Sequence, residues 1–161
     1  MDFEKVLLSR KSCRKFTDKP VEQEKLEKVV TAASLAPLGL PKMCTPMLTV
    51  VTDKKMLASL SGIYDAPALI IASCPPSIAP GLTDQNAGCV VEMMALMATS
   101  LGLGNIYLYG VTANLQKEPE KMAKLGIPEN FTPLAALALG YGEEDVEVCK
   151  EFVGKLNVTR V

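Results

Sequence analysis

The 161-residue chain contains no histidine and no tryptophan, and only three of its seventeen cationic side chains are arginine. Without histidine, the sequence cannot build a Ser-His or Cys-His nucleophile pair or the usual histidine-ligated catalytic zinc site. We therefore expect either that a bound cofactor supplies the chemistry or that the protein is not an enzyme. Aromatic residues make up 5% of the chain and hydrophobic residues 48%, which predicts a core of aliphatic side chains.

The cysteines show no pairing at metal-site or redox-motif spacing. Five cysteines stand at positions 13, 44, 74, 89 and 149, with no Cys-x-x-Cys pair among them. This pattern indicates neither a zinc cluster nor a dithiol redox motif, and we expect reduced thiols, no bound metal and a cytoplasmic location. The first twelve residues have no apolar signal segment, and the most apolar stretch, 87–103, is interrupted by Glu92, so no membrane association is expected.

The length and the hydrophobic pattern predict one domain over residues 1–161. Apolar residues at helical spacing predict helices over 2–10, 21–35, 54–60, 84–101 and 118–126. Continuous apolar runs predict strands over 48–53, 66–73, 105–109 and 133–142, and proline-rich loops over 37–46 and 74–83. The alternation of helices with fully apolar strands is typical of a three-layer α/β or α+β domain.

The positive charge is concentrated near the beginning of the chain. The net charge is −1, which argues against a nucleic-acid-binding polyelectrolyte, yet five of the ten residues from Arg10 to Lys19 are cationic. Two interpretations stay open. Arg10, Lys11, Ser12 and Arg14 can form a phosphate or other anion site, because arginine binds phosphate with two parallel hydrogen bonds and serine adds a hydroxyl donor. Alternatively, the cluster is a solvated turn after a helix.

Two common nucleotide-binding motifs are absent. The chain has no GxxxxGK[ST] phosphate loop. The Gly-x-Gly from Gly102 to Gly104 follows a predicted helix and precedes a predicted strand, the reverse of the order in a dinucleotide-binding fold. We interpret these glycines as the end of the helix.

Five segments stand out in order along the chain: RKSCRKF at 10–16, AASLAP at 32–37, DAPALIIAS at 65–73, SLGLGNIYLYG at 100–110 and ALALGYGEE at 136–144. Their order and spacing resemble the nitroreductase family of flavin mononucleotide (FMN) enzymes over nearly the whole length. The resemblance implies an α+β fold, a three-layer α/β/α sandwich with a central mixed β-sheet. It also implies an intertwined homodimer with one FMN in each of two clefts at the subunit interface.

The resemblance also implies which residues bind FMN. The phosphate would be held by Arg10, Lys11, Ser12 and Arg14, with further cations near the C-terminus, Arg160 and Lys155. Backbone groups of Tyr109 and Gly110, at the end of the third predicted strand, would approach the flavin ring. The loop Pro37–Pro46 lacks the Asn, Gln and Trp that most members carry there, so the backbone of Pro37, Leu38, Gly39 and Leu40 would have to replace their hydrogen bonds.

The implied activity is that of an FMN-dependent oxidoreductase. NADH or NADPH would give hydride to the flavin, and a small acceptor such as a nitroaromatic, quinone or enone would then use the same cleft, a ping-pong mechanism. Because the flavin carries the redox chemistry, the lack of histidine is no obstacle and no side chain is expected to be catalytic. The altered loop keeps open a flavin-binding storage, carrier or sensor protein without turnover. A module that binds nucleic acid or another anion is disfavoured, because only Phe16 accompanies the basic cluster as a stacking platform.

Overall fold

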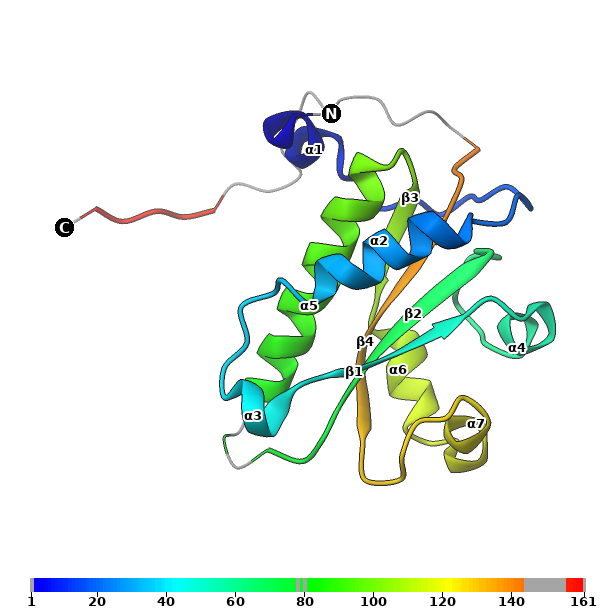
Figure 1. Ribbon diagram of the computed structural model, residues 1–161, viewed down its shortest axis with the longest axis vertical. Helices are drawn as coiled ribbons and strands as arrows, with labels where there is room; N and C mark the ends of the chain where they lie inside the picture. The colour runs from blue at the N-terminus through cyan, green and yellow to red at the C-terminus, as the bar shows by residue number, and fades with distance from the viewer. Residues whose placement is uncertain (1, 78, 80, 144–155, 161) are drawn as a thin grey trace.

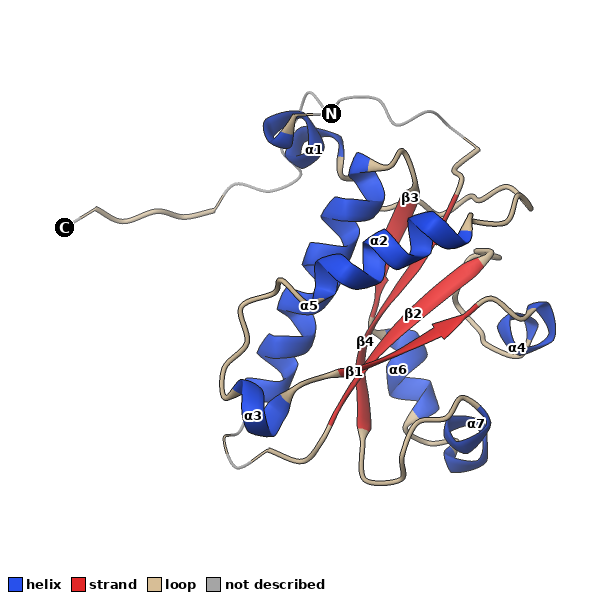
Figure 2. Cartoon of the chain, in the orientation of Figure 1, coloured by secondary structure: helices blue, strands red, loops and turns tan. Residues whose placement is uncertain are grey.

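The computed structural model describes residues 2–77, 79, 81–143 and 156–160. These residues form a four-stranded sheet with helices on both faces (Figures 1 and 2). The strands are β1 (Met47–Val51), β2 (Ala68–Cys74), β3 (Gly104–Leu108) and β4 (Thr132–Gly140). The helices are α1 (Phe3–Ser9), α2 (Gln23–Ala33), α3 (Pro41–Cys44), α4 (Lys54–Ala58), α5 (Leu82–Ser100), α6 (Gly110–Leu115) and α7 (Pro119–Lys124).

The sheet has the strand order β1-β2-β4-β3, and each neighbouring pair is antiparallel. The N-terminal segment adds two isolated bridges at one end of this sheet. Ser12 pairs with Asn105 in a parallel bridge, and Phe16 pairs with Gly142 in an antiparallel one. The resemblance implied a mixed sheet. Among the described residues, the one parallel pairing is the bridge between Ser12 and Asn105.

The two central strands are buried and divide the core into two halves. Side chains alternate between the faces of a strand, so Ile70 of β2 and Leu137 of β4 lie in one cluster, whereas Leu69 and Ile71 of β2 lie in the other. The first cluster is completed by α2 and α5, and the second by α4, α6 and α7 (Figure 1). The three-layer α+β architecture expected from the sequence is confirmed.

Most predicted elements are present within a few residues of the expected bounds. At the beginning of α1, the Asp2 side chain accepts a hydrogen bond from the Lys5 amide at 2.9 Å and caps the helix. Two helices were not predicted. Helix α3 is a single turn inside the loop expected over 37–46, and α6 has the sequence GVTANL, whose glycine, β-branched residues and asparagine have low helix propensity. Both are shorter than the window in which helical periodicity can be recognised.

Helix α5 is the longest helix of the described chain, with 19 residues, and Glu92 is exposed on it. None of the helices in the described ranges is long and apolar enough to cross a membrane.

Candidate functional site

The basic segment after α1 is fixed to the ends of β3 and β4 by backbone hydrogen bonds. The Cys13 amide donates to the Asn105 carbonyl at 2.9 Å, and the Thr17 amide donates to the Tyr141 carbonyl at 2.8 Å. On the other side, the Glu143 amide donates to the Lys15 carbonyl at 3.2 Å. A segment held at both ends in this way presents its side chains in defined directions.

The cationic side chains of this segment point to solvent. Lys11, Ser12 and Arg14 are exposed and Arg10 is half-buried. The four salt bridges found among the described residues join Lys19 and Lys25 to Glu22, Lys28 to Glu24 and Lys121 to Glu118, and thus use none of these groups. Two guanidinium groups, an ammonium group and a hydroxyl thus lie within five consecutive positions, and no carboxylate of the described residues forms a salt bridge with these cations. This donor set fits a phosphate dianion.

Gly104, the first residue of β3, allows the basic segment to lie this close to the sheet. A Cβ atom on Gly104 would lie 2.8 Å from Cys13 Sγ and 3.0 Å from Cys13 Cβ. The interpretation of both glycines as a helix end is thus correct for Gly102, whose φ is +75°, and wrong for Gly104. Position 104 requires glycine because Cys13 packs against it, and a contact between positions so far apart in the chain cannot be seen in a local sequence pattern.

The loop after α2 is held by the side chain of Asn86, a residue of α5 that is 2% exposed. Its Oδ1 accepts from the Gly39 amide at 2.9 Å, and its Nδ2 donates to the carbonyls of Gly39 at 3.0 Å and Cys44 at 3.2 Å. Both backbone groups of Gly39 are therefore already paired within the chain. Sequence reasoning missed Asn86, and the signal that could have found it is a polar residue in an otherwise apolar helix.

The same loop presents apolar side chains to solvent. Leu35 is 70% exposed, Leu40 45% and Met43 54%. Leu40 has a φ of +48°, a left-handed conformation that is unusual for a residue with a side chain. Pro37 is exposed and Leu38 half-buried. The loop thus replaces the polar side chains typical of the resembled family with an apolar surface.

Tyr109 and Gly110 lie beyond the end of β3, and not within it as expected, because Gly110 is the first residue of α6. Tyr109 is 69% exposed, and its carbonyl accepts from Thr112 Oγ1 at 2.8 Å. A Cβ atom on Gly110 would meet nothing within 4 Å. Asn105 lies near the beginning of β3 and Leu108 at its end, roughly 10 Å apart at strand spacing. A ligand that touched both the basic segment and Gly110 would therefore have to be extended.

Of the two expected C-terminal cations, the structure describes Arg160 alone. Lys155 lies outside the described residues. Arg160 is exposed, in a segment, 156–160, that extends away from the sheet and the helices (Figure 1).

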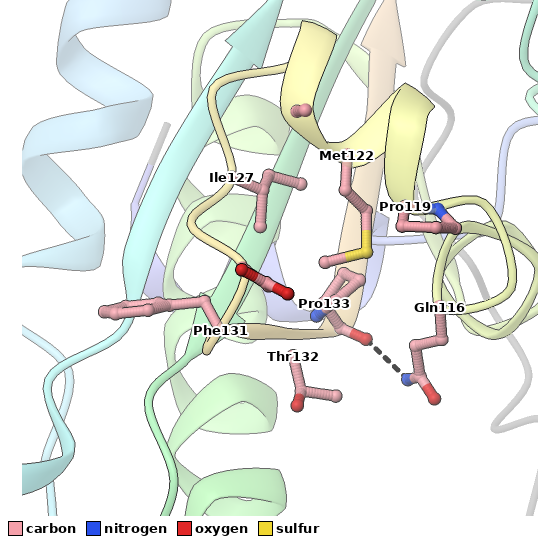
Figure 3. A pocket seen from close by; sticks show the side chains of 9 residues that line it. Gln116, Pro119, Met122, Ile127, Phe131, Thr132 and Pro133 are labelled. Carbon is pink, nitrogen blue, oxygen red and sulfur yellow. Dashed lines mark hydrogen bonds between the residues drawn. The ribbon is translucent and has the colours of Figure 1, made fainter.

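Two pockets lie away from the basic segment and from the loop held by Asn86. One, of about 490 Å³, is formed by Met122, Ile127, Phe131 and their neighbours at the beginning of β4 (Figure 3). Its Gln116 amide already donates to the Pro133 carbonyl at 2.8 Å. The other, of about 600 Å³, lies between α4 and α7. Neither is lined by a residue expected to bind FMN.

Comparison with known proteins gives the family. The profile of the Nitroreductase family matches residues 7–40, which include the basic segment and the first part of the loop held by Asn86. A protein of Methanothermobacter thermautotrophicus named as an NADH dehydrogenase/NAD(P)H nitroreductase is 30% identical over 155 residues, which cover 90% of this chain and 80% of that protein.

Solved structures agree in fold. A nitroreductase family protein of Clostridium difficile has 30% identity and a TM-score of 0.76, covering 93% of this chain and 90% of its own. A nitroreductase of Desulfitobacterium hafniense with bound FMN has 25% identity and a TM-score of 0.81, covering 99% of this chain and 100% of its own. The likeness in sequence and fold extends over nearly the whole length of these proteins, and the chain belongs to the nitroreductase family.

Proposed function

We propose that this protein is an FMN-dependent oxidoreductase, formed by a single domain over residues 1–161, that passes electrons from NADH or NADPH to a small organic acceptor. Nitroaromatics, quinones and enones are the acceptor classes to test. The observation that carries the proposal is the group of cations on the segment that bonds to Asn105 and Tyr141, none of which forms a salt bridge with a carboxylate of the described residues. The bound FMN of the Desulfitobacterium hafniense structure and the name of the Methanothermobacter relative support it.

Arg10, Lys11, Ser12 and Arg14 would hold the FMN phosphate. The arginines can each give two parallel hydrogen bonds, Lys11 adds charge, and the Ser12 hydroxyl donates without adding charge. We also assign Arg160 and Lys155 to this phosphate. Because Arg160 extends away from its own sheet, it would reach a phosphate held by another copy of the chain.

Tyr109, Gly110 and the loop Pro37–Leu40 would surround the flavin ring. Open space beside Gly110 lets a planar group approach its backbone. Gly39 would lie beside the flavin ring without a hydrogen bond to it, because its amide and carbonyl are already bonded to Asn86. The nearby Leu38 and Leu40 side chains would exclude water from an apolar ring.

Bound FMN would supply the hydride and electron transfer that no side chain of a histidine-free chain provides. The protein's part is to bind, orient and exclude water. Because donor and acceptor would occupy the same cleft in turn, we expect ping-pong kinetics, with protons taken from solvent.

We further propose a homodimer with the FMN sites at its interface. Large apolar side chains are exposed on α1 and on the loop after α2, among them Phe3 at 67% and Leu7 at 50%. Phe3 and Leu7 stand four positions apart on one face of α1, and exposed apolar side chains grouped in this way are typical of an interface. A flavin-loaded protein that sediments as a monomer would contradict this part of the proposal.

The experiment compares Arg14→Ala with Lys124→Ala, which removes an exposed cation of α7 instead. The expected result is that Arg14→Ala weakens FMN binding about tenfold or more, since a hydrogen bond between charged groups is worth about 1.5–3 kcal/mol. NAD(P)H oxidation at limiting FMN should fall in parallel, and Lys124→Ala should leave both unchanged. Equal FMN affinity in the two variants would place the phosphate elsewhere.

A further inference from the structure

Two buried polar atoms lie beside the basic segment without a hydrogen-bond partner among the described residues. They are Ser9 Oγ, at the end of α1, and Asn105 Oδ1, on β3, and each residue is 1% exposed. Leaving a buried polar atom unpaired is costly, and natural proteins rarely do so.

The orientation of the Asn105 amide is set by its other hydrogen bonds. Its Nδ2 donates to the Ala95 carbonyl at 3.2 Å and to Thr99 Oγ1 at 3.0 Å. The carbonyl can only accept, and the Thr99 hydroxyl uses its own hydrogen on Ala95 at 2.9 Å. The amide nitrogen must therefore face α5, which leaves the oxygen as the group without a donor.

Ser9 and Asn105 line one small cavity together with Lys11, Cys13 and Gly142. Its volume is about 20 Å³. A single water needs about 10–15 Å³ measured in this way, together with two to four polar partners. The cavity therefore has the size for one water molecule and no larger ligand, and within a mostly apolar lining the two unpaired atoms supply the polar partners that a water needs.

We propose that this cavity binds one buried water molecule, which donates to Asn105 Oδ1 and forms a second hydrogen bond with Ser9 Oγ. The water thereby joins α1 to β3. Helix α1 buries only Val6 and Ser9, so this bridge adds to a small set of buried contacts. Arg10 follows Ser9 directly, and the bridge would order the Arg10–Ser12 segment. Its consequence for FMN binding rests on the proposed function.

Ser9→Ala tests the bridge through the sign of its effect on stability. If the hydroxyl bonds a water, its removal leaves the water underbonded, and the melting temperature should fall by about 2–4 °C. If the hydroxyl is unpaired, its removal relieves a buried polar group and the melting temperature should rise. Ser34→Ala, at the exposed end of α2, is the control for the helix propensity of alanine. A rise in Ser9→Ala beyond that control would overturn the proposal.

A crystal structure of the flavin-free protein at about 1.5 Å resolution gives the direct observation. The expected result is one ordered water within about 2.7–3.2 Å of both Ser9 Oγ and Asn105 Oδ1. A dry cavity, or a Ser9 hydroxyl turned to bond Asn105 directly, would overturn it.

Hydrogen exchange of the Cys13 amide, which bonds the Asn105 carbonyl at 2.9 Å, tests the ordering of the segment without any flavin. Ser9→Ala should speed this exchange about fivefold, the factor that corresponds to one hydrogen bond, and should weaken FMN binding severalfold. Unchanged exchange would overturn the ordering role. Faster exchange in a protein that binds no FMN would leave the water bridge standing and refute only the proposed function.

Discussion

The attachment of the 37–44 loop through Asn86 leads to a quantitative prediction. Asn86→Ala removes three hydrogen bonds, two to Gly39 and one to Cys44. Each is worth about 1 kcal/mol net, and backbone groups left without partners add to the loss. Because Gly39 is half-buried, water can form hydrogen bonds with its freed backbone groups and offset part of the lost stability. We expect the free energy of unfolding to fall by about 2–4 kcal/mol, which is a large share of the roughly 5–15 kcal/mol that typically stabilises a domain.

The assay is urea and thermal unfolding, with Gln85→Ala as the matched control. Gln85 is the neighbouring residue of α5 and is exposed, so its removal should change stability by less than about 0.5 kcal/mol. Asn86→Ala should lower the melting temperature by roughly 5–12 °C and should make the exposed Lys42 in the loop a faster site of proteolysis. Equal stability of the two variants would refute the attachment.

Three other variants test separate parts of the structure. Gly104→Ala should destabilise the fold by about 1–3 kcal/mol, because its Cβ would lie 2.8 Å from Cys13 Sγ, and adding Cys13→Ala should restore much of the loss in the same unfolding assay. Tyr141→Phe should raise the pKa of Glu22 in an NMR titration, because the Tyr141 hydroxyl, donating at 2.6 Å, is the main cause that lowers this pKa from 4.5 to about 2. Since the pKa is lowered in the fold, Glu22 stabilises the native protein above pH 4.5 and loses this contribution as the pH falls toward 2, and the variant should show less of this acid dependence. Arg10→Ala should weaken FMN binding as Arg14→Ala does, and the binding of FMN to the unmodified protein should weaken with added salt, since it relies on exposed charges.

Local patterns predicted much of this fold because its central elements are strongly apolar. The run 66–73 could only be a buried strand, and β2 is buried along its whole length. Helix α5 was equally clear from its length and its apolar character. Helix α3 was missed because it is a single turn inside a proline-rich loop, and α6 because its residues have low helix propensity, so that Gly110 was assigned to a strand end.

The candidate site depended more on contacts between distant positions. The cluster of arginine, lysine and serine at 10–14 is visible in the sequence, but its attachment to Asn105 is not. The same holds for Asn86 with Gly39, which are 47 positions apart, and for Gly104 with Cys13. In each case the role of the residue depends on a contact with a distant part of the chain, and its neighbours in the sequence do not indicate that contact.

The most direct test of the proposed function is the reaction of the purified, FMN-loaded protein with NADH and with NADPH in the absence of oxygen. The proposal predicts that at least one donor bleaches the flavin absorbance within the time of a catalytic turnover, and that adding a quinone or nitroaromatic restores it. Flavin that stays oxidised with both donors would contradict an oxidoreductase and indicate a flavin-binding protein without turnover.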